Sequence, residues 1–92
     1  AENYRHAALD GVTSAFELEV GTGDIDRWYR EREPGQLIHY GVAIGHIPVR
    51  MAVMKDPGDF LPSGPAANAA ASDTEVAEMR RRIEAGLRAG AV

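Results

Sequence analysis

The order of hydrophobic and polar positions along the 92 residues predicts helices alternating with strands. A short helix is expected over 2–9, and Asp10-Gly11 should end it, because glycine accepts the left-handed conformation that closes helices. Over 12–20 the large apolar residues Phe16, Leu18 and Val20 occur at every second position, and this period of two is typical of a β-strand. A second helix is expected over 25–33, with Asp24 as its N-cap and Pro34-Gly35 as its stop.

The segment 37–47 is apolar nearly throughout and predicts a second strand. Such a run suits a parallel strand that is covered on both faces better than a half-solvated antiparallel strand. Its small residues alternate with larger ones and share one face, which fits a crowded interior such as the inside of a closed barrel. These small residues are Gly41, Ala43 and Gly45.

A long loop is expected over 48–71, because prolines and glycines interrupt the chain and no periodicity survives there. Loops of this length in compact domains are usually functional or disordered, and an active-site lid is one interpretation. The last helix should begin after Ser72, which has capping-box spacing to Glu75, and should end at Gly90. Its apolar stripe consists of Val76, Met79, Ile83 and Leu87.

The element order indicates an α/β fold built from parallel βα units with right-handed crossovers. The first predicted helix closes at Gly11 and leads into a strand, and the last closes at Gly90 and leads into Ala91-Val92 in the same way. Two parallel strands alone leave both sheet edges open. We therefore expect residues 1–92 to be one segment of a larger domain, or else an obligate homo-oligomer.

Charge and cysteine content narrow the possible partners. The net charge is −4, and arginines are interleaved with acidic residues over 27–33, which argues against nucleic-acid and anionic-membrane partners. The sequence contains no cysteine, so it has neither a disulfide framework nor a thiolate metal ligand. No apolar run is long enough to span a bilayer. A reducing, cytoplasmic location fits these features.

Two carboxylates in the first strand stand out as candidate metal ligands. Glu17 and Glu19 share one strand face, and the other face carries Phe16, Leu18 and Val20. If helices cover the apolar face, both carboxylates point into the interior, where they need ionic partners, hydrogen bonds or a metal. An edge strand with its polar face in water explains the same pattern and is the commoner situation.

Other polar residues near the strand ends are candidates for substrate binding. His46 is expected at the C-terminal end of the second strand, where parallel α/β proteins place their sites, although a histidine bonded to a carbonyl fits equally well. Arg50 could clamp a substrate carboxylate, but an ordinary surface arginine is the more frequent case. Gly21-Thr22-Gly23 lacks the third glycine of a dinucleotide-binding loop, so we reject that interpretation.

A series of short segments resembles the N-acyl-D-amino-acid deacylase branch of the amidohydrolases, over essentially the whole chain and in order. The segments are Gly11-Val12-Thr13-Ser14, Gly45-His46 with Arg50, Asp73-Thr74-Glu75 and Ala89-Gly90-Ala91. The resemblance implies a (β/α)8 TIM barrel with one or two divalent metals, usually zinc, that hydrolyses an amide through metal-activated water. The chain would supply the second and third strands with their flanking helices.

The resemblance also assigns roles to individual residues. The family's His-x-His metal pair would precede this segment, and its later histidines and general-base aspartate would follow it. Many relatives have a cysteine ligand at the position of Val20, so we expect the neighbouring Glu19, or Glu17, to replace it as an oxygen ligand. His46 and Arg50 match the segment of the third strand and would contact the substrate or the metal-bound water.

Two hypotheses therefore remain open at the level of sequence. In the first, the chain is a segment of a metal-dependent hydrolase of non-peptide C–N bonds. Its substrate would be a small N-acyl (D-)amino acid or related amide, and the intact protein would bind zinc or another divalent metal. In the second, it is a non-catalytic α/β fragment that is stable only through self-association. Under both, this chain alone is expected to be inactive and to bind no metal tightly.

Overall fold

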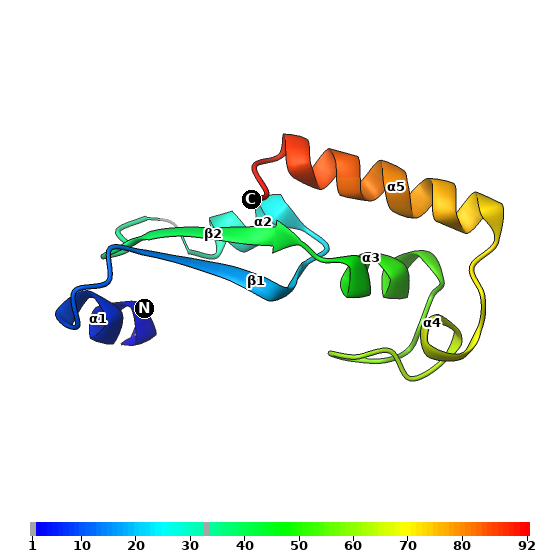
Figure 1. Cartoon of the computed structure of the whole chain (residues 1–92), viewed down its shortest axis with the longest axis horizontal. Coiled ribbons are helices and arrows are strands. Elements are labelled where there is room, and N and C mark those ends of the chain that lie inside the picture. The colour runs from blue at the N-terminus through cyan, green and yellow to red at the C-terminus, as the bar shows by residue number, and fades with distance from the viewer. Residues whose placement is uncertain (1, 33) are drawn as a thin grey trace.

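In the computed structural model, which describes residues 2–32 and 34–92, the chain forms two parallel strands and five helices (Figure 1). The elements in order are α1 (Glu2–Leu9), β1 (Ser14–Thr22), α2 (Ile25–Arg30), β2 (His39–Ile44), α3 (His46–Val53), α4 (Pro65–Asn68) and α5 (Asp73–Arg88). The chain is thus an α/β protein with parallel strands, as the sequence predicts. The second predicted helix ends at Arg30, and residue 33, where it was expected to end, lies outside the described residues.

The two strands pair in regular parallel register over their first halves. Ser14 is opposite His39 and Glu17 is opposite Val42, but the next pair is Thr22 with Ile44, so β1 contains a bulge between Glu17 and Thr22. Side chains of a strand alternate between the two faces of a sheet. The register therefore places Glu17 on the same face as Val42.

Helices cover the sheet face that carries Tyr40 and Val42. The rings of Tyr4 in α1 and of Trp28 and Tyr29 in α2 lie with their centroids between 5.9 and 6.1 Å from that of Tyr40. Val42 is fully buried on this face. At the carboxyl end of β2, Gly86 of α5 packs closely on Ile44. A Cβ atom added to Gly86 would lie 2.7 Å from the Ile44 side chain.

The opposite face of the sheet is open. Phe16 lies on it beside Gly41, where an added Cβ would be 2.7 Å from the Phe16 ring, and it is 55% exposed. Leu18 is 61% exposed. Helices therefore do not cover the apolar face of β1, which was the condition for both carboxylates to point into the interior. They cover the face that carries the large residues of β2, and the register puts Glu17 on that face.

The hydrophobic core lies beyond the sheet, where α3, α4 and α5 meet. Its buried residues are Val49, Met51, Met54, Ala66 and Met79. Two expectations are corrected here. The second strand ends at Ile44, so His46 begins α3 instead of lying in the strand, and the segment 48–71 contains most of α3 and all of α4. Pro48, where the loop was expected to begin, falls in the first turn of α3, where the backbone N–H groups have no intrahelical acceptor and proline is tolerated.

The same backbone motif ends α1 and α5. Gly11 and Gly90 have φ values of 88° and 109°, and each helix closes through a hydrogen bond five residues back. These bonds run from Val12 N–H to the Ala7 carbonyl at 2.9 Å and from Ala91 N–H to the Gly86 carbonyl at 3.1 Å. Both ends are Schellman motifs, which confirms the predicted helix closures at Gly11 and Gly90.

The residue after the second motif reaches the free edge of β2. Val92 N–H donates to the Val42 carbonyl at 3.0 Å. The backbone N–H groups of His39 and Gly45 point toward β1, where they donate to the carbonyls of Thr13 and Thr22. Val42 lies three residues after His39 and three before Gly45. Because alternate backbone groups of a strand point to opposite edges, the Val42 carbonyl points away from β1. Figure 1 shows the C-terminus beside β2 and α2.

The molecule is elongated. Its principal extents are 47 × 26 × 18 Å and its radius of gyration is 15.3 Å. A compact domain of this length has a radius of gyration of about 12 Å. Figure 1 shows why: α1 lies at one end of the sheet, whereas α3, α4 and much of α5 extend beyond the other. Of the described helices, none has both the length and the apolar character required to span a lipid bilayer.

Candidate functional site at the carboxyl ends of the strands

The carboxyl ends of β1 and β2 are joined to each other. Gly45 N–H donates to the Thr22 carbonyl at 2.9 Å, immediately before α3 begins. Gly45 must be a glycine, because a Cβ atom there would overlap the Val20 carbonyl oxygen and crowd Pro48. The ends of parallel strands are where α/β proteins most often place ligands. Of the residues singled out from the sequence, Glu19 lies near this end of β1 and His46 begins α3, whereas Glu17 lies in the middle of β1 and Arg50 lies one turn into α3.

The Glu17 carboxylate folds back on its own strand. It accepts the backbone N–H groups of Gly21 at 2.7 Å, Glu19 at 3.0 Å and Val20 at 3.4 Å. These donors lie in the bulge, where they lack strand partners in the β1–β2 ladder. Glu17 therefore braces the irregular end of β1, and three of the acceptor positions on its oxygens are already in use.

Glu19 is different because its side chain is exposed. Its backbone N–H is held by Glu17, so the strand position of Glu19 is set by its neighbour. A single exposed carboxylate can supply one oxygen ligand to a divalent cation, but not a complete site. In residues 2–32 and 34–92 we find no group of three or more His, Asp and Glu side chains that could hold a metal ion.

His46 and Arg50 lie together on α3, one helical turn apart. Both line an open, mainly apolar groove of about 340 Å³ between α3 and α5, and neither Glu17 nor Glu19 takes part in it. The residues contributed by α5 are Val76, Met79, Arg80, Ile83 and Glu84. The structure thus brings the two predicted substrate-binding residues together, on a groove that contains neither Glu17 nor Glu19.

Arg50 also fastens the segment around α4. Its Nε donates to the Ala66 carbonyl and its Nη2 to the Ala69 carbonyl, each at 2.8 Å. Two of its five N–H donors are therefore committed to the backbone of the loop. Its contribution at this edge includes holding the loop in place.

Asp56 is a functional residue of the loop that the sequence interpretation missed. Its Oδ1 accepts N–H groups from Gly58 at 2.8 Å and Ser63 at 2.9 Å, and its Oδ2 accepts those of Gly64 and Ala66, both at 2.9 Å. Desolvation raises the pKa of Asp56, but the four backbone hydrogen bonds outweigh it, so the net shift of the pKa is downward. The sequence signal was available: Asp followed by Pro and Gly is typical of a turn in which the carboxylate binds backbone N–H groups ahead of it.

The Asp56 loop forms one wall of a second groove, of about 330 Å³, at the carboxyl end of β1. The end of β1 supplies the residues of 20–23, and α3 supplies the apolar side chains of Pro48, Met51 and Ala52. The loop supplies Asp56, Gly58, Asp59 and Phe60. Phe60 is 67% exposed, so an aromatic ring borders this groove without being part of the core.

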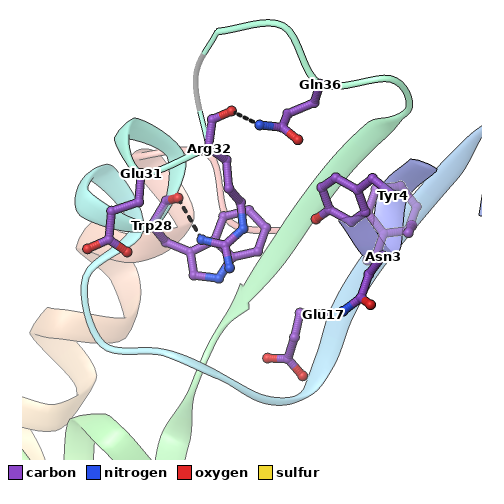
Figure 2. A pocket seen from close by; sticks show the side chains of 9 residues that line it. Asn3, Tyr4, Glu17, Trp28, Glu31, Arg32 and Gln36 are labelled. Atoms are coloured by element: carbon purple, nitrogen blue, oxygen red, sulfur yellow. Dashed lines mark hydrogen bonds between the residues drawn. The ribbon is translucent and has the colours of Figure 1, made fainter. Parts of the chain in front are cut away.

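A larger groove of about 600 Å³ lies on the helix-covered side, between α1, α2 and β1 (Figure 2). Figure 2 shows Glu17 at the β1 wall and the Trp28–Arg32 pair on the other side of the groove. The Arg32 guanidinium lies 3.6 Å from the Trp28 ring centroid and donates to the Trp28 carbonyl at 3.0 Å. Gln36 in turn donates to the Arg32 carbonyl. The charged side chains of this groove already have partners within the chain, Glu17 on β1, Glu31 with Arg27 and Arg32 with Trp28, and we assign no chemistry to it.

Comparisons of the chain with protein-family models, with curated proteins and with solved structures found no match in any of the three. The resemblance to the amidohydrolases therefore remains an interpretation of the sequence.

Proposed function

We propose that the chain forms part of the barrel wall of a metal-dependent amidohydrolase that acts on N-acyl amino acids or related amides. The observation that carries the proposal is the hydrogen bond from Val92 N–H to the Val42 carbonyl. This bond lies on the edge of β2 that faces away from β1. A strand that began at Val92 would therefore be third in the sheet, after β1 and β2, in the order of the sequence. The strands on both sides of β2 would then each follow a helix that ends in a Schellman motif: β1 follows α1, and the new strand follows α5. Such repetition is expected of a βα barrel.

The distribution of side chains on the two sheet faces supports the proposal. Helices cover the Tyr40 face, whereas the open face combines the large Phe16 and Leu18 with the small Gly41 and Ala43. In a closed barrel the outer face packs against helices, and the inner face is filled by layers of side chains from neighbouring strands. The open face of this sheet has the composition of such an inner layer.

At the carboxyl edge, this chain would contribute one metal ligand and a framework for the substrate. Glu19, in the bulge where the regular alternation of β1 is broken, would donate a carboxylate oxygen to zinc, with the remaining ligands supplied by elements beyond the described residues. Zinc, when bound, supplies Lewis acidity and a water of lowered pKa. Glu17 would hold the Glu19 backbone, His46 would contact the substrate, and Arg50 would position the adjacent loop.

The test uses the protein as its source cells produce it. We expect an intact denatured mass several-fold above the 9.9 kDa of this chain, bound zinc, and hydrolysis of N-acetyl-D-amino acids. In that protein Glu19→Gln should lower the zinc stoichiometry, whereas Glu31→Gln, at the exposed C-cap of α2, should not. A native protein of 9.9 kDa without zinc or hydrolase activity would overturn the proposal.

A second candidate, a non-catalytic fragment that self-associates, is favoured by a different observation. Phe16 and Leu18 are 55% and 61% exposed on the open face of β1, and the outer edge of β1 pairs with no other described strand. A second copy could cover both features. Sedimentation of the 92-residue chain should then show a dimer that Phe16→Lys dissociates. A monomer that folds cooperatively would exclude this candidate.

A further inference from the structure

We infer that the groove between the end of β1, α3 and the Asp56 loop binds the uncharged alkyl part of an acyl group, with Phe60 as the residue that selects its length. The inference rests on the proposed function, because it assigns one end of the amide substrate to this groove. The groove lies at the carboxyl edge of the strands, next to the bulge that contains Glu19. Its volume of about 330 Å³ suits part of a small molecule.

The first step concerns the loop, which is built to hold Phe60 in one place. Four hydrogen bonds to the Asp56 carboxylate tie residues on both sides of Phe60 to the same side chain. Two further bonds from Arg50 fix the segment that follows. Lys55 has a φ of 54°, which turns the chain sharply out of α3 into this loop. An aromatic side chain on a fastened loop is a preorganised contact, so little conformational entropy is lost when a ligand packs on it.

The second step is that the core does not need Phe60. Its side chain is 67% exposed, and the buried cluster of α3, α4 and α5 is formed by other residues. Across the groove, Pro48, Met51 and Ala52 present an apolar surface. A ligand placed between this surface and the Phe60 ring would bury apolar area on both of its sides, which is favourable in proportion to the area removed from water.

The third step is the charge of the lining, which decides the kind of group that fits. Two of the lining residues, Asp56 and Asp59, are acidic, and the lining contains no Lys, Arg or His. A carboxylate would be repelled here, since like charges disfavour each other. In an N-acyl amino acid the acyl chain is the uncharged end, so this groove suits the acyl chain and excludes the amino-acid carboxylate.

The experiment is a titration of the intact 15N-labelled protein that contains this chain, followed by NMR, with hexanamide, acetamide and hexanoate as probes. Hexanamide should shift the amide signals of Gly21, Gly23, Gly58 and Phe60 in a saturable way, and acetamide and hexanoate should shift them far less. Phe60→Ala should weaken hexanamide binding about tenfold through lost apolar contact. Leu61→Ala is the matched control, because Leu61 is 55% exposed on the same loop but does not line the groove.

The inference is overturned if hexanamide produces no saturable shifts at these residues, if hexanoate binds as tightly as hexanamide, or if Phe60→Ala binds as tightly as Leu61→Ala. The shifts of the unmodified chain decide the location even if a variant fails to fold. Since zinc content and native mass test the proposed function separately, a failure of the groove assignment can be distinguished from a failure of the proposed function.

Discussion

Asp56 and Ala66 are ten residues apart, yet Oδ2 of Asp56 accepts the backbone N–H of Ala66 at 2.9 Å. This bond places the Asp56 carboxylate at the N-terminus of α4, where a negative charge is favoured. The same carboxylate accepts three more N–H groups from the intervening loop. A segment that appears irregular in sequence is therefore organised by one side chain.

Replacing this side chain should release the loop without unfolding the rest of the chain. In Asp56→Ala the N–H groups of Ser63, Gly64 and Ala66 lose their acceptor, and their amide exchange should accelerate by about tenfold or more. Asp59→Ala is the control, since Asp59 is exposed on the same loop. Hydrogen–deuterium exchange measured by NMR checks the prediction. Equal protection of these amides in both variants would show that the loop is held by other contacts.

The loop should also open in acid. The pKa of Asp56 is lower in the folded loop than its ordinary value of 3.8, so the ionised carboxylate stabilises the folded loop. This stabilisation has its full value above pH 3.8. This contribution is lost as the pH falls through the lower, folded pKa. Protection of the Gly64 and Ala66 amides should therefore decrease below pH 3.8, and this decrease should be absent in Asp56→Asn. A decrease that persists unchanged in Asp56→Asn would assign the effect to another group.

A second acid effect is expected in α5. Glu78 accepts hydrogen bonds from Arg81 and Arg82, which lower its pKa from 4.5 to about 2. The ion pairs stabilise the helix fully above pH 4.5 and are lost as the pH falls toward about 2. Helicity followed by circular dichroism should decline over this range, and Glu78→Gln should flatten the decline. Glu84→Gln, which removes the pair with Arg80, serves as the comparison.

Local signals in the sequence were sufficient for the helix ends. The Ser72 hydroxyl accepts Glu75 N–H at 3.2 Å and the Glu75 carboxylate accepts Ser72 N–H at 3.1 Å, which confirms the predicted capping box. The predicted Asp24 cap is also confirmed, through its bond from Arg27 N–H. These motifs are complete within three residues, so the sequence alone contains their geometry.

Features that depend on residues far apart could not be predicted in the same way. The helix-covered face of β1 is set by its pairing with β2, and a strand pattern is compatible with either face until the register is known. The Arg50 bonds to Ala66 and Ala69 span 16 and 19 residues and use backbone acceptors, which leave no trace in side-chain composition. For the same reason His46 and Arg50 could be placed at the strand edge, but the groove that they share with α5 could not.

The junction of the two strand ends should tolerate no side chain at residue 45. In Gly45→Ala the added Cβ meets the Val20 carbonyl and the Pro48 ring, both held by the packed strand and helix. We expect a loss of about 2 kcal/mol or more in the free energy of unfolding, as for an overpacked interior position. Gly23→Ala provides the control, because its nearest neighbour would be Pro48 at an ordinary 3.6 Å. Urea unfolding of both variants measures the difference, and equal midpoints would contradict the close approach.

The core between α3 and α5 should depend on Met79 rather than on the whole apolar stripe of α5. Met79 is 5% exposed and belongs to the buried cluster, whereas Val76 lies on the same stripe but is 53% exposed. Met79→Ala leaves a cavity among Val49, Met51 and Met54 and should cost about 2–4 kcal/mol. Val76→Ala should cost less than about 1 kcal/mol, because little of its side chain leaves water on folding. If urea unfolding shows equal losses for the two variants, then α5 is covered on its exposed side as well, which is the outcome that a self-associated chain would produce.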